Sequence, residues 1–460
     1  MAAVTTVKRD DTYKHFWDRY SDRPDIGSMM LNKNADELEE SDRFDVLDSL
    51  PDVTGKDVVD IGAGIGRFTS VFAEKARHVV STDFIESFIL KNRERNAHFN
   101  NITFKVADAI HLELPSSSVD LVFTNWLLMY LSDSETLQFL LNVLRWLRPD
   151  GYVKLRESCS QPSTGRSTNV TLHSDANPTS YRFESIYIEL VQNLRYRCPE
   201  GKIWRLDIQW SCSVPTYIKH FGNWRQVHWL AKKVLAEDQQ APLAYDQYLQ
   251  LFSHDWQDEQ REIDMKLDGE RSNWSDSVFN DAILANSAIV PKNSTIISYN
   301  PRRLAYHCHI NAHLLAERFT CNIWNVETNP YYYRTSLTKS TELKDNRVRF
   351  GWNENLALAI KYWGDHEAAF HSFLATELLS TTDEATMDQL PKILNNDSHL
   401  LLLEPADNVE QDSLRFKKIL EKNFKVVSIS EVTEQVHAHI KEYLKNRKEV
   451  FFIYTGLIVA

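Results

Sequence analysis

Three glycines at alternate positions mark where this chain can bring its backbone against a small molecule. Gly62, Gly64 and Gly66 follow a short apolar run that ends in Asp60-Ile61. A residue without a Cβ permits a tight turn and close approach to a ligand, and such turns join strands of a parallel sheet to helices. Because the chain has 13 glycines in 460 residues, three within five positions predict a ligand-binding turn. We expect a helix to begin near Arg67, with free N–H groups that can face a negative group.

Polar residues also follow the next expected strands. The run 79–82 leads to Asp83, whose carboxylate can accept hydrogen bonds from two ribose hydroxyls. The run 102–106 leads to a second acid, at the adenine end of the same site, and the run 119–123 leads to an amide. Four such strand ends predict a site for a nucleoside that carries a small zwitterion. The candidate cofactor residues are Asp60, Gly62, Gly64, Arg67, Asp83, Phe84, Asp108, Ala109 and Asn125.

The glycine spacing separates two classes of cofactor. A dinucleotide fingerprint is G-x-G-x-x-G, whereas this chain has G-x-G-x-G. The pyrophosphate of a dinucleotide requires the longer loop, so the pattern favours S-adenosylmethionine over a nicotinamide cofactor. S-Adenosylhomocysteine is then the product.

Composition restricts the remaining choices. A chain of 460 residues predicts two or three domains, and a net charge of −12 argues against nucleic-acid or anionic-membrane partners. Its five cysteines form no C-x-x-C pair, and we interpret them as free thiols in a reducing compartment. No apolar run reaches the ~18 residues of a membrane span, and the first residues contain no apolar signal segment. We therefore expect a cytoplasmic protein, and no His/Cys cluster has the spacing of a metal site.

The order of expected elements predicts an α/β protein with a repeated unit. Residues 1–50 form a helical lid with aromatic side chains, and 51–235 alternate strands and helices around the glycine turn. Residues 236–290 resemble a helical linker or insertion, and 291–460 contain a second series of strand-like runs. The first of these runs ends in residues 299–303 (Tyr-Asn-Pro-Arg-Arg), without glycine, so we expect this second domain to have lost its cofactor loop.

A known family carries the same motifs. The run VVDIGAGIGRFTSVFAEKARHVVSTDFIESFILKNRERN, with FTNWLLMYLSDSE and LRPDGYVKLRESC, resembles the first methyltransferase domain of the phosphoethanolamine N-methyltransferases over roughly residues 10–235. The likeness is to the nematode type, which has an active first domain and an inactive second one. It implies a Rossmann-like class I methyltransferase domain followed by a degenerate methyltransferase-like domain. It also implies transfer of a methyl group from S-adenosylmethionine to phosphoethanolamine, giving phosphomonomethylethanolamine, the first step toward phosphocholine. A second methyltransferase would then perform the later steps.

The amine of such a substrate must lose a proton before it attacks the methyl group. The family uses aromatic hydroxyls and an imidazole or acid around the amine, and the matching positions are Tyr20 or Tyr13 in the lid, with Trp126 and Tyr130. Protist members have Asp and His where this chain has Trp126 and Tyr130, so a Tyr–His dyad does not carry over. Tyr130 either orients the amine or packs a helix, and Trp126 either offers a cation–π face or lies in the core.

Phosphate requires hydrogen-bond donors. Tyr181, Arg182 and Tyr187 supply two phenols and a guanidinium, and the family holds phosphate with a Tyr, an Arg and a second Tyr from this helix. The resemblance adds Lys219 and Ser28 as substrate-binding candidates. The alternative for each charged residue is a solvated surface position.

Two other functions compete with this interpretation. The chain is either a methyltransferase for another small amine or, in part, a regulatory partner of a methyltransferase, and fold alone separates neither. The Tyr-Arg-Tyr cluster argues against the first, and the intact cofactor turn argues against the second for the amino-terminal half.

Overall fold

The computed structural model describes residues 16–22, 24–32, 34–159, 179–221, 223, 225–236, 240–252, 290–300, 312–327, 347–352, 356–365, 369–376, 378–406, 408–434 and 450–458. These residues fall into two units, within 1–208 and 225–257 for the first and within 209–224 and 258–460 for the second. Most of the expected linker, 236–290, and residues 160–178 lie outside the described residues.

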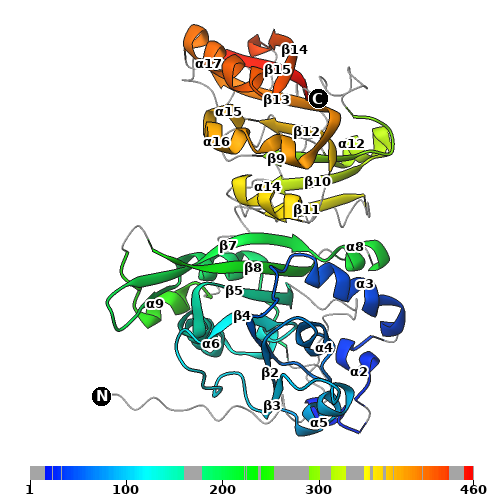
Figure 1. Cartoon of the computed structure of the whole chain (residues 1–460), viewed down its shortest axis with the longest axis vertical. Coiled ribbons are helices and arrows are strands. Elements are labelled where there is room, and N and C mark those ends of the chain that lie inside the picture. Colours follow the sequence, from blue (N-terminus) through cyan, green and yellow to red (C-terminus); the bar gives the residue numbers. More distant parts are fainter. Residues whose placement is uncertain are drawn as a thin grey trace. The chain divides into compact units, whose positions relative to one another are not determined.

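The first unit contains a mainly parallel sheet in the order β3-β2-β1-β4-β5-β8 (Figure 1). Its parallel strands are β1 (Asp57–Ile61), β2 (His78–Asp83), β3 (Ile102–Val106), β4 (Val119–Thr124) and β5 (Leu147–Ser158). The antiparallel strand β8 (Gln226–Leu235) pairs with β5, and β6 (Arg195–Arg197) pairs with β7 (Ile203–Ser213). The strand order reverses between β1 and β4, which is where open α/β sheets bind ligands.

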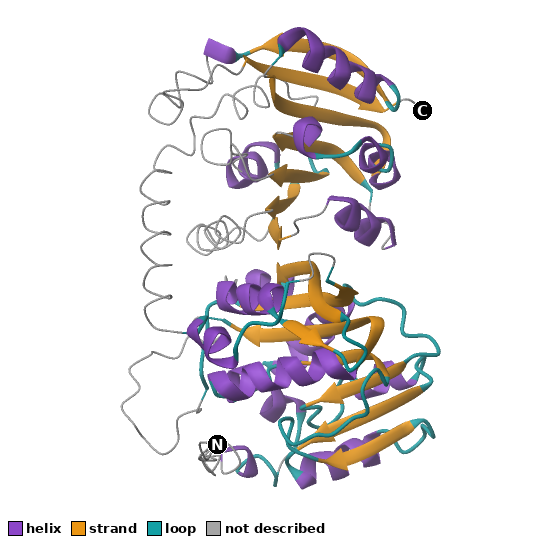
Figure 2. Ribbon diagram, turned by 90° about the vertical axis from the view of Figure 1, so that its left-hand side faces the viewer, coloured by secondary structure: helices purple, strands orange, loops and turns teal. Residues whose placement is uncertain are grey.

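Helices connect and cover these strands (Figure 2). The amino-terminal pair is α2 (Ile26–Met30) and α3 (Ala35–Leu47), and the connecting helices are α4 (Thr69–Ala73), α5 (Glu86–Arg95) and α6 (Asp133–Trp146). A 3-10 turn, η1 (Leu128–Tyr130), follows β4, and α7 (Glu184–Asn193), α8 (Pro215–Phe221) and α9 (Tyr245–Gln250) come later in the chain.

Local sequence explains the helix after β4. Ser132 accepts a hydrogen bond from the backbone N–H of Glu135, and the Glu135 side chain accepts one from the N–H of Ser132. This capping box satisfies two N–H groups that the first turn of a helix leaves without partners. The helix therefore begins at Asp133, directly after this cap.

The second unit repeats the strand order of the first. Its parallel strands are β9 (Thr295–Asn300), β10 (Asn322–Glu327), β11 (Val348–Trp352), β12 (Phe370–Thr376) and β13 (Leu394–Ala406), in the order β11-β10-β9-β12-β13. The antiparallel strands β15 (Val450–Ile458) and β14 (Phe424–Glu431) complete it. Its helical segments are α12 (Ala312–Phe319), α14 (Leu356–Asp365), α15 (Leu378–Thr381), α16 (Glu384–Met387), η2 (Leu390–Ile393) and α17 (Val409–Glu421). A second α/β unit of the same class is thus confirmed, although β12 was missed in the sequence.

Residues 209–224 group with the second unit, whereas the sequence analysis assigned them to the first domain. Trp210 explains the difference, because its ring lies 5.5 Å from that of Trp324 and 5.6 Å from that of Trp363. Gly351 of β11 leaves room for this indole, since a Cβ at Gly351 would lie 2.8 Å from Trp210.

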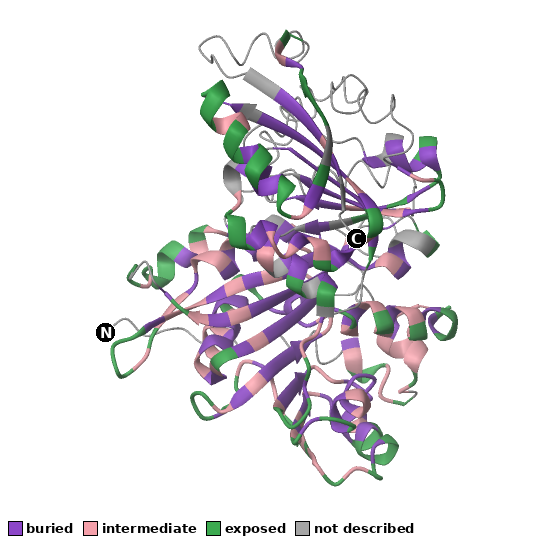
Figure 3. Cartoon of the chain, turned by 45° about the horizontal axis from the view of Figure 1, so that its top comes forward, coloured by how far each residue is buried: buried purple, intermediate pink, exposed green. Residues whose placement is uncertain are grey.

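The central strands of each sheet are buried, as Figure 3 shows for both units. In the first unit, Val58, Val59, Val122 and Val153 are at most 1% exposed. Burial on both faces is expected for a parallel sheet that helices cover. None of the helices in the described residues is long and apolar enough to cross a membrane.

Candidate functional site

The glycine turn lies between β1 and α4. Gly62, Gly64 and Gly66 all have positive φ, at 70°, 53° and 80°, a conformation that residues with a Cβ avoid. The helix that follows begins at Thr69, two residues later than expected, and is only five residues long.

Each glycine meets a different neighbour. A Cβ on Gly62 would lie 3.3 Å from Leu127 in the loop after β4, and a Cβ on Gly64 would lie 2.8 Å from the sulfur of Met29 in α2. A Cβ on Gly66 would overlap the Asn92 side chain of α5. The first two glycines therefore border segments that carry candidate site residues, whereas the third is required by packing inside the unit.

Two buried acids stand at this edge of the sheet. Asp83, 6% exposed, accepts hydrogen bonds from the backbone N–H of Gly64 and of Ile85, both at 2.9 Å. Burial raises its pKa to about 6, so the carboxylate is charged at neutral pH and remains an acceptor. Asp60, 2% exposed, accepts from the hydroxyl of Thr69 at 2.6 Å. Burial, and then the charge of Asp83, raise the pKa of Asp60 to about 7.

The other candidate cofactor residues lie at the same strand ends. The N–H of residue 107, after β3, donates to the carbonyl of Asp83 at 2.9 Å, which joins the ends of β3 and β2. Asp108 follows and accepts from the N–H of Ile110 at 2.9 Å, while Ala109 is buried. Phe84 and Asn125 are half-buried, directly after β2 and β4.

Arg67 has a different role from the one expected. Its guanidinium is 4% exposed and pairs with Asp42 of α3 at 3.0 Å, with Glu39 of the same helix at 3.5 Å. The Arg67 side chain therefore joins α3 to the end of the glycine turn, and a contact of the Arg67 backbone with the cofactor stays a prediction. Helix α4, at five residues, also begins beyond Arg67.

Amino-terminal aromatic residues contact the sheet edge. The Trp17 ring lies 5.5 Å from that of Tyr130, 6.1 Å from that of Phe88 and 5.7 Å from that of Tyr20. Tyr20 is half-buried and Tyr130 is 7% exposed, so both expected phenols pack on one indole. Tyr13, the alternative to Tyr20, lies outside the described residues.

Helix α2 approaches the glycine turn from the same amino-terminal segment. The side chain of Asp25 caps it by accepting from the N–H of Ser28 at 2.8 Å, and Ser28 is half-buried. Met30 belongs to a small core cluster against which Trp126 packs. The elements expected to form a lid thus contact both the glycine turn and the loop after β4.

Trp126 already has a cation on its ring. The Arg156 guanidinium carbon lies 3.5 Å from the ring centroid, and the Trp126 Nε1–H donates to Gln226 at 2.7 Å. One face of this ring is therefore covered by a side chain of β5, and the expected cation–π contact with the substrate ammonium, which stays a prediction, would have to use the other face. Trp126 also has a positive φ of 59°, so its backbone is strained.

The three residues of the expected phosphate clamp differ in their exposure and in their partners. Arg182 is 4% exposed and pairs with Asp133 at 2.7 Å, and its guanidinium also donates to the Tyr187 hydroxyl at 3.4 Å. Tyr187 is 1% exposed, and its ring lies 5.3 Å from Trp229. These two side chains belong to the interior, where an acid already neutralises the guanidinium. Tyr181 is half-buried, and the side chain of Lys219, in α8, lies outside the described part of the chain.

Sequence reasoning missed three buried charges around this edge. Asp42 is 0% exposed and bridges Arg67 and Arg156, accepting from each at 3.0 Å. Glu157, also 0% exposed, binds backbone N–H groups of the loop after β4. A signal existed, because Arg156 and Glu157 stand at the end of an apolar strand and charges there require partners.

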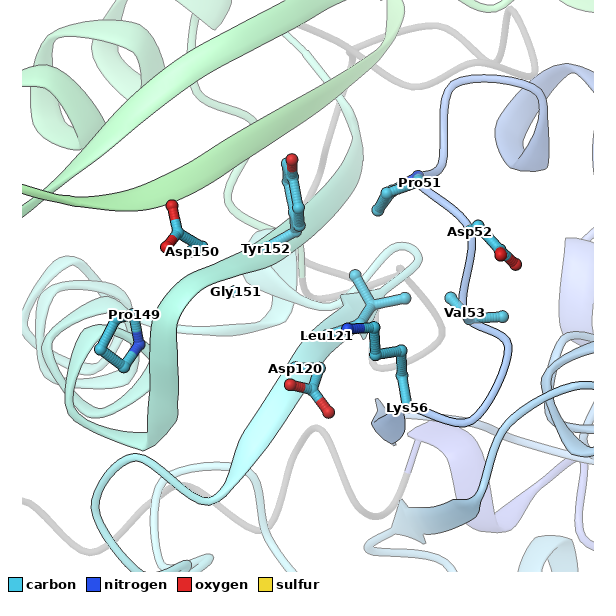
Figure 4. Close-up of a pocket in the computed structure, with 10 residues that line it drawn as sticks. All are labelled: Pro51, Asp52, Val53, Lys56, Asp120, Leu121, Pro149, Asp150, Gly151 and Tyr152. Carbon is cyan, nitrogen blue, oxygen red and sulfur yellow. The ribbon is translucent and has the colours of Figure 1, made fainter. Parts of the chain in front are cut away.

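The pocket drawn in Figure 4 lies near the amino-terminal ends of the strands, opposite the end that carries the glycine turn. It is lined by residues near the starts of β1, β4 and β5, among them Lys56, Asp120 and Tyr152. An ion-pair network of Asp57, Arg148 and Asp120 stabilises this edge, with both Arg148 contacts at 2.8 Å. In the residues that the structure describes, no group of three or more His, Cys, Asp or Glu side chains could hold a metal ion.

Comparisons with known proteins agree with this geometry. A family model for a methyltransferase domain matches residues 58–151. Phosphoethanolamine N-methyltransferase 1 of Caenorhabditis elegans is 53% identical over 97% of this chain and 94% of its own length. Phosphoethanolamine N-methyltransferase 1 of Triticum aestivum is 39% identical over 48% of this chain and 44% of its own. Among solved structures, Haemonchus contortus phosphoethanolamine N-methyltransferase 1, in complex with phosphoethanolamine and S-adenosylhomocysteine, is 52% identical with a TM-score of 0.89, and 98% of each chain is covered.

Proposed function

The chain belongs to the phosphoethanolamine N-methyltransferases, and from that premise we propose that its first unit transfers the methyl group of S-adenosylmethionine to the amine of phosphoethanolamine. The nitrogen lone pair forms the new N–C bond while the methyl–sulfur bond breaks. S-Adenosylhomocysteine leaves, and the proton that the substrate ammonium gave up to free this lone pair goes to a base of the site or to water. The observation that carries this proposal is the similarity, over nearly the whole chain, to relatives of that activity.

The cofactor residues of this proposal are the glycine turn and the acids that follow the strands. Asp83 is a charged acceptor at neutral pH, as two ribose hydroxyls require. Gly62 and Gly64 keep the turn free of Cβ atoms where Leu127 and Met29 already approach it. S-Adenosylmethionine supplies the electrophilic methyl group when bound, and these residues hold its nucleoside.

The amine site of this proposal contains the two phenols around Trp17. A primary amine has a pKa near that of lysine, about 10.4, so the site must remove a proton at neutral pH. Tyr20 and Tyr130 are proposed to orient the amine and to receive or relay that proton. Trp126 is proposed to line the amine site without binding the ammonium through the ring face that Arg156 covers.

For the phosphate end we retain Tyr181, Ser28 and Lys219 as proposed donors. Arg182 and Tyr187 are the weaker candidates, because Arg182 pairs with Asp133 and Tyr187 is 1% exposed.

We further propose that one methyl group is the main product and that another methyltransferase completes the later steps, because no glycine follows the first strand of the second unit. Residues 301–311, which would form the corresponding turn, lie outside the described ranges. We also propose a cytosolic enzyme without nucleic-acid or membrane partners. The net charge of −12 supports this, as does the finding that none of the four cysteines in the described ranges forms a disulfide.

The test is calorimetric titration of the full chain with S-adenosylmethionine and phosphoethanolamine, followed by product analysis. We expect Asp83→Ala to weaken cofactor binding by about 1–3 kcal/mol, the cost of losing bonds to a charged acceptor. Asp52→Ala, at the opposite edge, is the matched control. Ethanolamine methylated as efficiently as phosphoethanolamine would favour the alternative of another small-amine methyltransferase, and efficient formation of phosphocholine would contradict the single methylation.

A further inference from the structure

The loop that follows β4 is held on one side by a buried carboxylate. Glu157 accepts hydrogen bonds from the backbone N–H groups of Leu127, Leu128 and Met129, at 3.1, 2.8 and 3.1 Å. The residue is 0% exposed. Three N–H donors replace the water that the carboxylate loses on burial, so this contact fixes the direction of three successive peptide groups.

The same loop is held on its other side by a buried guanidinium. Arg182 donates to the carbonyls of Leu128 and Leu131 at 3.0 and 2.7 Å. Its remaining contacts go to Asp133, through Nε at 2.8 Å and Nη2 at 2.7 Å, and to the Tyr187 hydroxyl at 3.4 Å. A guanidinium has five N–H donors, and four of them make hydrogen bonds here: one from Nε, two from Nη1 and one from Nη2.

The clamped loop carries proposed site residues. Residues 127–131 lead from Trp126, whose φ is 59°, to Tyr130, whose ring packs on Trp17. A strained residue persists only where its surroundings hold it. Leu127 is also the neighbour that a Cβ on Gly62 would meet, so the loop borders the glycine turn.

We infer that Glu157 and Arg182 are positioning residues for methyl transfer, which hold the loop 127–131 by its N–H and C=O groups and so fix Tyr130 relative to the cofactor turn. This inference rests on the proposed function. It gives Arg182 a role in the geometry of the reaction and none in binding phosphate. Phosphate would have to displace Asp133 from the guanidinium, against the repulsion of a carboxylate.

The second unit contains the carboxylate half of this arrangement. Glu404 of β13 is 0% exposed and accepts from the N–H of Leu379, in α15 after β12, at 2.8 Å. A carboxylate anchor at this point therefore belongs to the fold of both units. The test of the inference consequently depends on the guanidinium and on a kinetic measurement.

The experiment uses the full chain with Arg182→Lys, steady-state kinetics on phosphoethanolamine, and inorganic phosphate as an inhibitor that probes the phosphate subsite. Lysine keeps the charge but loses the fork that reaches both carbonyls and Asp133. We expect kcat to fall at least about tenfold, because small displacements of reacting groups are costly. KM and the phosphate inhibition constant should change less than about threefold. Arg205→Lys changes an arginine in a half-buried ion pair with Asp207 and is the matched control. It should leave kcat, KM and the phosphate inhibition constant unchanged.

A second variant keeps the inference testable if Arg182→Lys does not fold. Asp133 is 49% exposed, and Asp133→Asn removes the charge that neutralises Arg182 while leaving both carbonyl contacts. We expect a smaller fall in kcat and an unchanged phosphate inhibition constant. Tighter phosphate inhibition in Asp133→Asn, or a raised KM with normal kcat in Arg182→Lys, would overturn the inference in favour of a phosphate ligand. A wild-type chain inactive on phosphoethanolamine would refute the proposed function itself.

Discussion

Replacement of Gly66 by alanine tests whether this glycine serves packing. A Cβ at this position would overlap Asn92 Oδ1, reach within 2.5 Å of Asn92 Cγ and lie 2.8 Å from Asn96 Nδ2. Both asparagines are 0% exposed. The new methyl group would therefore clash with two fully buried side chains, which can move only by disturbing the packing around them.

The expected loss of stability has two parts. Alanine at a φ of 80° costs about 1–2 kcal/mol, since the left-handed region crowds the Cβ against the backbone. Displacing Asn92 would break its hydrogen bonds to Ser81 at 2.9 Å and to Asn96 at 2.8 Å, each worth about 1–3 kcal/mol when buried. We therefore expect a total loss of about 3–8 kcal/mol in the free energy of unfolding.

Gly55 provides the matched control. Its φ is 69°, nearly that of Gly66, but a Cβ there would have no neighbour within 4 Å. Gly55→Ala should therefore cost only the backbone part, about 1–2 kcal/mol. The difference between the two variants isolates the clash with the asparagine network.

The assay is urea denaturation of the full chain, and the transition of the first unit is identified by its shift to higher urea with S-adenosylhomocysteine. The double variant Gly66→Ala/Asn92→Ala should be less destabilised than the sum of its single variants, because removing the amide makes room for the new methyl group. Equal losses for Gly55→Ala and Gly66→Ala would refute the packing explanation. The third glycine would then be read, as the sequence alone suggests, as a position required by the ligand.

Two further predictions concern the buried acids of the first unit. Asp42→Asn should lower stability by about 3–5 kcal/mol, because Arg67 and Arg156 would lose the charge between them. Arg77→Gln breaks an ion pair whose arginine is 63% exposed, so we expect a much smaller loss of stability than for Asp42→Asn. Equal losses for the two variants in urea denaturation would contradict this prediction. Burial raises the pKa of Asp60 from 3.8 to about 7 in the folded chain. The folded state therefore disfavours the ionised carboxylate, and the free energy of unfolding falls as pH rises from about 4 to about 7. The stability of wild type minus that of Asp60→Asn should therefore fall across this window, and a flat or rising difference would exclude the assignment.

The sequence by itself determined the order of elements and the cofactor edge. The G-x-G-x-G spacing, the acids after the second and third strands and the alternation with helices are local features, written over a few residues each. The structure has β1, β2, β3 and β4 where apolar runs predicted them, and the second unit contains strands, as its second series of strand-like runs predicted. The strand β12 was missed because Phe370–Thr376 contains His and Ser among its apolar residues and has no flanking turn signal.

Only the tertiary structure decided which polar groups are available to a ligand. Tyr181, Arg182 and Tyr187 have the composition of a phosphate clamp, yet Arg182 is neutralised by Asp133, 49 residues earlier in the chain. Arg67 and Arg156 likewise meet Asp42, which belongs to a helix that reads as a solvated acidic surface. The partner of a charge is set by which elements pack together, at separations of 25 to 114 residues here, and no local pattern encodes that choice. Residue types and spacing therefore predicted the chemistry of this protein, whereas long-range packing decided which side chains are free to perform it.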